Sequence, residues 1–115
     1  MLARRNRITE KKDFDNVFQR GRIFKSGFLI LRYSPNYLPE SRFGFIISTK
    51  VSKKSTLRNR LKRKMREAAR AILKSSAFSK SFDIVISLTP EAAKANFKDI
   101  QKTFELILKQ NNIIN

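Results

Sequence analysis

The segment between Lys50 and Lys74 concentrates the positive charge of this 115-residue chain. It holds eleven of the 26 Lys and Arg residues and a single acid, Glu67. An Arg guanidinium binds a phosphate group through two parallel hydrogen bonds, and a Lys ammonium binds it as a point charge. These residues could therefore recognise a polyanion, and nucleic acid is the leading candidate.

The same segment carries a regular apolar stripe, which a disordered basic tail has no reason to keep. The stripe recurs at the spacing of one helix face, at Leu61, Met65, Ala68 and Ile72. A different arc of the predicted helix carries an amide among cations, at Asn59, Lys62, Arg63, Arg66 and Arg70. Ordinary solvated faces mix both signs of charge, so phosphate binding is a better interpretation than a merely solvated face.

Three lysines, Lys50, Lys53 and Lys54, precede this predicted helix. Cations in the loop before a helix can help its N-terminal amide groups to hold a phosphate. The alternative is a solvated loop, and the spacing of these lysines alone does not decide between the two interpretations.

Aromatic residues beside other cations are a second candidate for nucleic-acid binding. Phe14 and Phe18 are four residues apart, so they share one face of a predicted helix. From the residues alone, core packing is the better interpretation of this pair. The alternative is a groove in which unpaired bases stack on the two rings, and Tyr33 is a weaker candidate of the same kind.

Composition excludes several kinds of catalysis. The chain has no Cys and no His, which removes disulfides, zinc sites and catalysis by cysteine or histidine. Asp13 and Asp15 are the only close carboxylate pair, and they point to different sides of a helix, so they are interpreted as surface charges. We predict that the protein holds no metal by itself and does not cut a phosphodiester bond alone.

The net charge of +17 and the sequence pI near 11.1 imply an anionic partner, because such a charge strains a compact monomer. Residues 75–115 are almost balanced, with five bases and four acids, so the anion-binding surface is predicted in the first half and the central helix. The N-terminus lacks the apolar core of a signal peptide, and no apolar run is long enough to span a membrane. We therefore expect a cytoplasmic protein.

A single domain of the α/β (α+β) class is predicted over residues 1–115. A first helix over 10–20 is expected to be capped by Thr9 and ended by Gly21. The other predicted elements are strands over 23–24, 28–33 and 43–48, the cationic helix to about residue 74, a strand over 82–88 covered on both faces, and a C-terminal helix starting at Thr89 or Asn96. The order α-β-β-β-α-β-α predicts a two-layer sandwich.

Several stretches of the chain resemble the protein component of bacterial ribonuclease P. RNRLKRKMRE is similar to the signature helix of that family, R-N-R, one apolar residue, K-R, two residues, then R-E or R-Q. The matching residues are Arg58, Asn59, Arg60, Lys62, Arg63 and Arg66. KKDFDNVFQRG resembles the first helix of the family, and RNRI, STKVSKK, FGFIIS and FDIVIS fit its lead-in, loop and strands. The resemblance covers nearly the whole chain in order.

The resemblance implies a small α/β sandwich with an unusual left-handed βαβ crossover. It implies a ribonucleoprotein subunit whose RNA partner, ribonuclease P RNA, is the catalyst and removes the 5′ leader of precursor tRNA. Mg²⁺ would be bound mainly by the RNA, and neither a membrane nor a protein partner is implied. The residues lining the leader-binding cleft would be Phe14, Phe18, Asn59, Lys62 and Arg66. The residues that dock on the catalytic RNA would be Lys50, Lys53, Lys54, Arg58, Arg60 and Arg63.

The resemblance thus reverses the core-packing interpretation of the two Phe residues. It also marks positions at which the chain departs from the family. Ser52 stands where Gly is common. Leu31 stands where some members carry a Tyr on the cleft side of the first strand, which makes Tyr33 a candidate substitute.

Two further functions fit part of the sequence. A structural RNA-binding protein, such as a small ribosomal protein, explains the charge and the size, but not the two signature helices together. A DNA-binding protein that places the cationic helix in a major groove explains that helix alone, and strands flank it where a helix-turn-helix pair would be needed.

Overall fold

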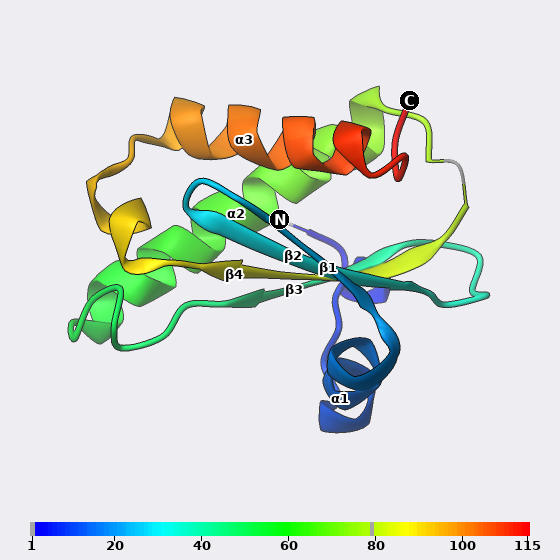
Figure 1. Cartoon of the computed structure of the whole chain (residues 1–115), viewed down its shortest axis with the longest axis horizontal. Helices are drawn as coiled ribbons and strands as arrows, with labels where there is room; N and C mark the ends of the chain where they lie inside the picture. Colours follow the sequence, from blue (N-terminus) through cyan, green and yellow to red (C-terminus); the bar gives the residue numbers. More distant parts are fainter. Residues whose placement is uncertain (1, 79) are drawn as a thin grey trace.

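The computed structural model describes residues 2–78 and 80–115, and within them four strands form one sheet (Figure 1). The strands are β1 (Arg22–Ser26), β2 (Leu29–Pro35), β3 (Arg42–Ile46) and β4 (Phe82–Leu88). Their order across the sheet is β1-β2-β4-β3, with β3 parallel to β4 and the other neighbours antiparallel. The turn between β1 and β2 uses Gly27, whose φ of 56° lies in the region that favours glycine.

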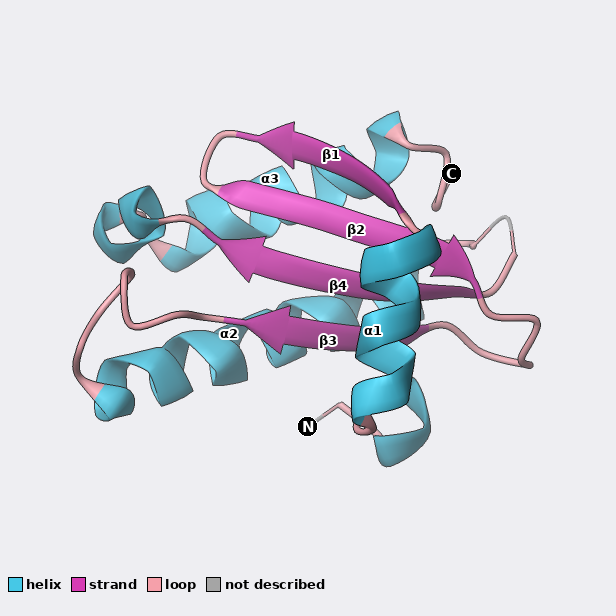
Figure 2. Cartoon of the chain, turned by 60° about the horizontal axis from the view of Figure 1, so that its bottom comes forward, coloured by secondary structure: helices cyan, strands magenta, loops and turns pink. Residues whose placement is uncertain are grey.

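Helices cover the two faces of the sheet unequally. The helices are α1 (Lys11–Arg20), α2 (Ser55–Ser75) and α3 (Phe97–Gln110), with short 3₁₀ helices η1 (Arg4–Asn6) and η2 (Pro90–Lys94). Helices α2 and α3 lie side by side on one face, and α1 crosses the opposite face (Figures 1 and 2). In Figure 2, β3 and β4 point the same way while α2 passes behind the sheet, so the β3–α2–β4 crossover is left-handed. Most such crossovers are right-handed.

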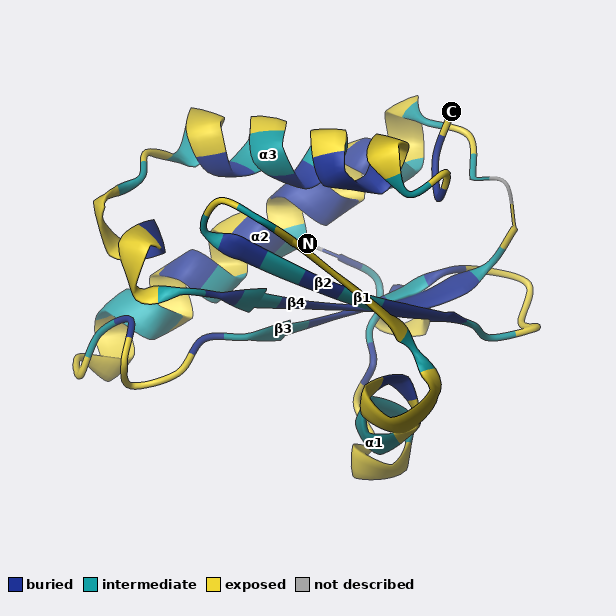
Figure 3. Ribbon diagram, in the orientation of Figure 1, coloured by how far each residue is buried: buried dark blue, intermediate teal, exposed yellow. Residues whose placement is uncertain are grey.

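The main core fills the space between the sheet and the α2/α3 layer (Figure 3). Its largest fully buried side chains include Phe43, Met65, Ile84 and Phe104. A smaller cluster beneath α1 buries Ile8, Val17 and Val85, with Phe14 and Ile46 packed against it. Among the described residues, α1 and the N-terminal segment before it cover only part of this second face, so the rest stays accessible.

The predicted element order is confirmed, and β4 has the predicted bounds with both faces covered. Of the two predicted starts of the last helix, Asn96 is the N-cap of α3, and its Oδ1 accepts a hydrogen bond from the amide of Asp99 at 2.9 Å. The Thr89 start leads only into η2. The predicted Thr9 cap is wrong, because Glu10 is the N-cap of α1 and its side chain forms no capping hydrogen bond to the described residues.

Two glycines allow α1 to lie close to the sheet. A Cβ on Gly21 would lie 2.4 Å from the carbonyl oxygen of Val17 and 2.9 Å from that of Tyr33. A Cβ on Gly44 would lie 2.5 Å from the ring of Phe14. Gly44 therefore provides the space into which Phe14 fits. Within the described residues, none of the helices is both long enough and apolar enough for a membrane span.

Candidate nucleic-acid interface

Most cations on the outer surface of α2 form no ion pair among the described residues. The apolar stripe of α2 is buried against the sheet, as the spacing of Leu61, Met65, Ala68 and Ile72 predicts. Glu67 is the only acid on α2, and its carboxylate lies 3.9 Å from Arg70. The helix therefore presents an excess of positive charge to the solvent.

The two flanks of α2 look in different directions. On one flank, the ammonium of Lys64 lies 5.9 Å from the ring centre of Phe97 in α3. On the other flank, Leu73 and Arg70 line a hollow together with residues of the N-terminal segment, Leu2 and Asn6.

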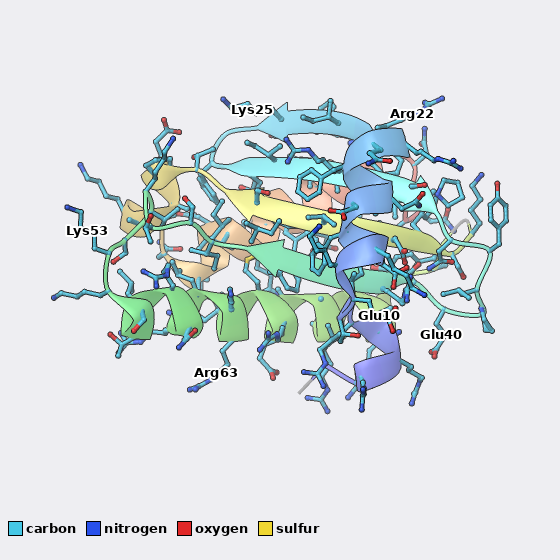
Figure 4. The ribbon with its side chains drawn as sticks, turned by 90° about the horizontal axis from the view of Figure 1, so that it is seen from below. Glu10, Arg22, Lys25, Glu40, Lys53 and Arg63 are labelled. Atoms are coloured by element: carbon cyan, nitrogen blue, oxygen red, sulfur yellow. The ribbon has the colours of Figure 1, made fainter. Side chains whose placement is uncertain are left out.

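Helical periodicity places three residues of the predicted leader set, Asn59, Lys62 and Arg66, toward this second flank. Lys62 and Arg66 are half-buried there and Asn59 is exposed. Of the set predicted to dock on the catalytic RNA, Arg60 and Arg63 are exposed on the outside of the helix, and Arg63 points away from the sheet in Figure 4.

Arg58 has a different environment from the other arginines of the signature. It is half-buried, and its Nη1 donates a hydrogen bond of 2.9 Å to the carbonyl oxygen of Ser52. Arg58 thus fixes the loop that precedes α2, in addition to any contact with RNA. The sequence alone does not reveal this structural role, because the partner is a backbone atom.

The lysine loop before α2 is ordered by its own serines. The hydroxyl of Ser48 accepts a hydrogen bond from the amide of Lys50, and that of Ser52 accepts one from the amide of Lys54, both at 3.2 Å. The side chains of Lys50, Lys53 and Lys54 are exposed. Lys54 is the N-cap of α2, and within the described residues no side chain caps this helix. The positive end of the helix dipole is therefore open beside three lysines.

Helix α1 places the two Phe residues in different environments. Phe14 is half-buried between Gly44 and Ile8, so it has a packing role. Phe18 is 44% exposed, and the guanidinium of Arg32 lies 4.7 Å from its ring centre. The guanidinium of Arg32 thus lies over one face of the Phe18 ring, on the α1 face of the sheet. Arg32 is a candidate that sequence reasoning missed, although alternation along β2 places it on this face.

Tyr33 does not lie on the α1 face, so it does not serve as the candidate stacking ring there, and the core-packing interpretation holds for it. Tyr33 is buried on the α2/α3 face, packs edge-on against Phe82 at 5.7 Å, and donates a hydrogen bond to Asn111 at 3.4 Å. Leu31 is fully buried on the same face. Side chains alternate along a strand, so the odd residues of β2 fill the core and the even ones face α1.

A partly buried charge cluster fixes α1 to the sheet. Arg42 of β3 donates two hydrogen bonds to Asp83 of β4, at 2.8 and 2.7 Å, and a weaker one to Asp13 of α1 at 3.4 Å. Hydrogen bonding to Asp83 raises the pKa of Arg42 above its usual value, so this guanidinium stays charged. The sequence predicts Asp13 to be a surface charge, and this prediction is wrong. Asp13 instead anchors α1, the helix that carries Phe18, to Arg42 of the sheet.

Comparison with known proteins identifies a family whose members share this arrangement of helices and strands. The family model described as Ribonuclease P matches residues 2–112. The chain belongs to the ribonuclease P protein family.

Among its relatives, the ribonuclease P protein component of Syntrophomonas wolfei is 32% identical over 110 residues, covering 96% of this chain and 90% of the relative. The ribonuclease P protein of Staphylococcus aureus has a solved structure that matches with a TM-score of 0.84 and 25% identity, covering 96% of this chain and 98% of that one. The ribonuclease P protein of Thermotoga maritima matches with a TM-score of 0.80 and 26% identity, covering 90% and 96%.

The predicted family, fold and main function are thus confirmed. The chain is a ribonuclease P protein component, its partner is ribonuclease P RNA, and the enzyme acts in tRNA processing. The matches give no support to the ribosomal alternative.

Proposed function

We propose that this protein binds the single-stranded 5′ leader of precursor tRNA on the α1 face of its sheet, while the outer surface of α2 docks on the catalytic RNA. The leader-binding residues are Phe14, Phe18, Asn59, Lys62 and Arg66. The residues that dock on the RNA are Lys50, Lys53, Lys54, Arg58, Arg60 and Arg63. The ribonucleoprotein would act in the cytoplasm.

One observation carries the leader assignment: Phe18 is a large aromatic side chain left 44% exposed beside Arg32 on the accessible face of the sheet. Unpaired bases stack on aromatic rings and on guanidinium planes, and this stacking contributes about 1–3 kcal/mol per base. The cations Lys62 and Arg66, on the flank of α2 nearer the N-terminal segment, would hold the leader phosphates. Phe14 contributes mainly by seating α1 on Gly44.

Mg²⁺ belongs to the RNA in this proposal. The protein acids that form ion pairs are Glu10, Asp13, Asp15, Glu40, Glu67, Asp83 and Glu105. Within the described residues, no group of three or more acids lies together. In this proposal the protein side chains screen the phosphate charges of the RNA and position the leader.

The decisive experiment is reconstitution at near-physiological Mg²⁺ with a bacterial ribonuclease P RNA and 5′-labelled precursor tRNA. We expect leader release from the mixture and none from the protein alone. RNA alone, tested at high Mg²⁺, is the control for an active catalyst. Cleavage by the protein alone would show that its carboxylates have been misjudged, and lack of stimulation of an active RNA would contradict the proposal.

A further inference from the structure

A groove lies on the opposite side of α1 from the accessible sheet face. Its volume is about 620 Å³. One wall is formed by Arg4, Arg5 and Arg7 of the N-terminal segment, and the other by Leu38 and Pro39 of the loop between β2 and β3. In Figure 4, the end of the molecule that carries Glu40 and the end that carries Lys53 lie on either side of α1. None of the residues predicted to bind RNA lies in this groove.

The arginine wall is part of the fold and not a loose tail. The side-chain amide of Asn6 donates a hydrogen bond to the carbonyl oxygen of Ser41 at 3.0 Å, and the backbone amide of Ile8 donates one to Phe43 at 2.9 Å. Arg7 itself forms a parallel bridge with Phe43 at the edge of β3. The backbone that carries the three arginines is therefore held in place before any partner binds, which lowers the entropic cost of binding.

The opposite wall is equally well held. The side-chain nitrogen of Asn36 donates to the carboxylate of Asp83 at 2.9 Å and to the carbonyl oxygen of Glu40 at 3.1 Å. The side-chain oxygen of Asn36 accepts from the amide of Leu38 at 2.9 Å. This rigid loop presents apolar surface to the solvent, because Leu38 is 43% and Tyr37 is 92% exposed.

The charges in the groove are not balanced by the protein. Glu40 is its only acid, and Arg5 pairs with it at 2.7 Å. Arg4 and Arg7 form no ion pair with any of the described residues. Nε of Arg7 is buried and has no hydrogen-bond acceptor among the described residues. Because this atom is closed to solvent, a ligand in the groove could contact Arg7 only through its terminal guanidinium nitrogens.

We propose that this groove binds an unpaired nucleotide of ribonuclease P RNA. The base lies against Leu38 and Pro39, and its phosphates accept hydrogen bonds from Arg4 and Arg7. An apolar wall facing a cationic wall fits a nucleotide, which has a flat base and an anionic backbone. The catalytic RNA is the source, because we assign the leader to the other side of α1. The inference uses the established RNA partner and, for this choice of source, the proposed leader site.

The first test uses the absence of cysteine from the sequence, which allows a single reactive thiol to be placed at will. Leu38→Cys carries a photoactivated crosslinker in the groove, and Leu106→Cys, at a position 53% exposed on α3, is the matched control. Both are reconstituted with ribonuclease P RNA and precursor tRNA. We expect Leu38→Cys to crosslink to a few adjacent nucleotides of the catalytic RNA and Leu106→Cys to give at most background.

Crosslinking of Leu38→Cys to the leader, or at the level of the Leu106 control, would overturn the inference.

A second measurement compares the affinity for ribonuclease P RNA of two double variants. One combines Arg4→Ala with Arg7→Ala, and the other combines Lys98→Ala with Lys102→Ala on α3. We expect the first to bind at least ten times more weakly and the second within about twofold of the parent protein. The affinity of the Arg4/Arg7 double variant should also depend less on salt. The slope of log K against log[salt] should become shallower by about 1.4, which is about 0.7 for each of the two lost phosphate contacts. Equal losses in the two double variants would also overturn the inference.

Failure of this inference and failure of the leader proposal have different signatures. The same samples report the ratio of affinities for precursor and mature tRNA. The groove variants should leave that ratio unchanged, because they act on the catalytic RNA. A parent protein that shows no preference for precursor tRNA would contradict the leader proposal, whatever the groove does. Thermal melting of each variant establishes that it is folded.

Discussion

Helices α2 and α3 lie on the same face of the sheet, yet their N-termini differ in capping. In α3, the side chain of Asn96 caps the helix and Asp99 lies in the first turn, so the positive end of the dipole is satisfied internally. In α2, the N-cap is Lys54, whose side chain forms no capping hydrogen bond within the described part of the chain, and the first turn has no acid. The first arrangement favours stability, whereas the second leaves an anion site open.

The outer surfaces of the two helices differ in the same direction. On α3, Glu105 pairs with Lys109 at 3.6 Å, and Asp99 adds a further acid beside Lys98 and Lys102. On α2 the cations outnumber the single acid Glu67. Each helix buries an apolar stripe of its own, so packing does not require the unbalanced charge of α2. We infer that this charge is retained for the RNA, at a cost in self-repulsion.

The buried sides of the two helices should respond alike to mutation. Met65 of α2 and Phe104 of α3 are both fully buried. We expect Met65→Ala to reduce the free energy of unfolding by about 2–5 kcal/mol and Phe104→Ala by about 3–5 kcal/mol, because each leaves a cavity. Denaturant unfolding measures both. A loss below about 1 kcal/mol in one of them would show that its helix packs more loosely than the structure indicates.

The outer sides should respond very differently. We compare a double charge reversal on α2, Arg60→Glu with Arg63→Glu, with one on α3, Lys98→Glu with Lys102→Glu. Hydrogen bonds to charged groups contribute about 1.5–3 kcal/mol each, so the α2 variant should lose about 3 kcal/mol of RNA binding, or about 150-fold. The α3 variant should lose only a few-fold. Filter binding to ribonuclease P RNA at fixed salt measures both, and similar losses would remove the distinction between the helices.

Substitutions at the proposed leader site should separate precursor from mature tRNA. Phe18→Ala removes a stacking surface, and Arg66→Ala removes a phosphate contact. Each should weaken binding of precursor tRNA to the holoenzyme by about 2 kcal/mol, roughly 30-fold, with little change for mature tRNA. Lys102→Ala on α3 is the matched control. Equal losses for both tRNAs would argue against the leader assignment.

The features predicted correctly from the sequence are those that depend on neighbours along the chain. The apolar stripe of α2, the central strand β4 and the Asn96 cap are all readable over a few residues. The face to which Tyr33 points cannot be predicted in this way, because it depends on strand register. A shift of one residue in register turns every side chain to the other face.

Contacts between distant segments are equally hidden from the sequence. Arg42 and Asp83 are 41 residues apart, and the pair becomes visible only when β3 lies beside β4. The contact between Arg32 and Phe18 likewise requires α1 to be placed on the sheet. The sequence therefore supports the candidate cations and rings, while their arrangement into surfaces follows from topology.

The two helix N-termini allow the smallest and most specific test of the comparison. Lys54→Asp gives α2 a capping side chain like that of α3, and this should raise its stability by about 1 kcal/mol. The same change places a carboxylate where we expect a phosphate, so RNA binding should weaken while the melting temperature rises. Asn96→Ala in α3 should do the reverse, lowering stability by about 1 kcal/mol with unchanged RNA affinity. If Lys54→Asp raises the melting temperature and lowers RNA affinity in the same preparation, the open N-terminus of α2 serves RNA binding at a cost in stability. If Lys54→Asp left RNA affinity unchanged, the exposed lysines alone would account for docking, and the helix dipole would have no part in it.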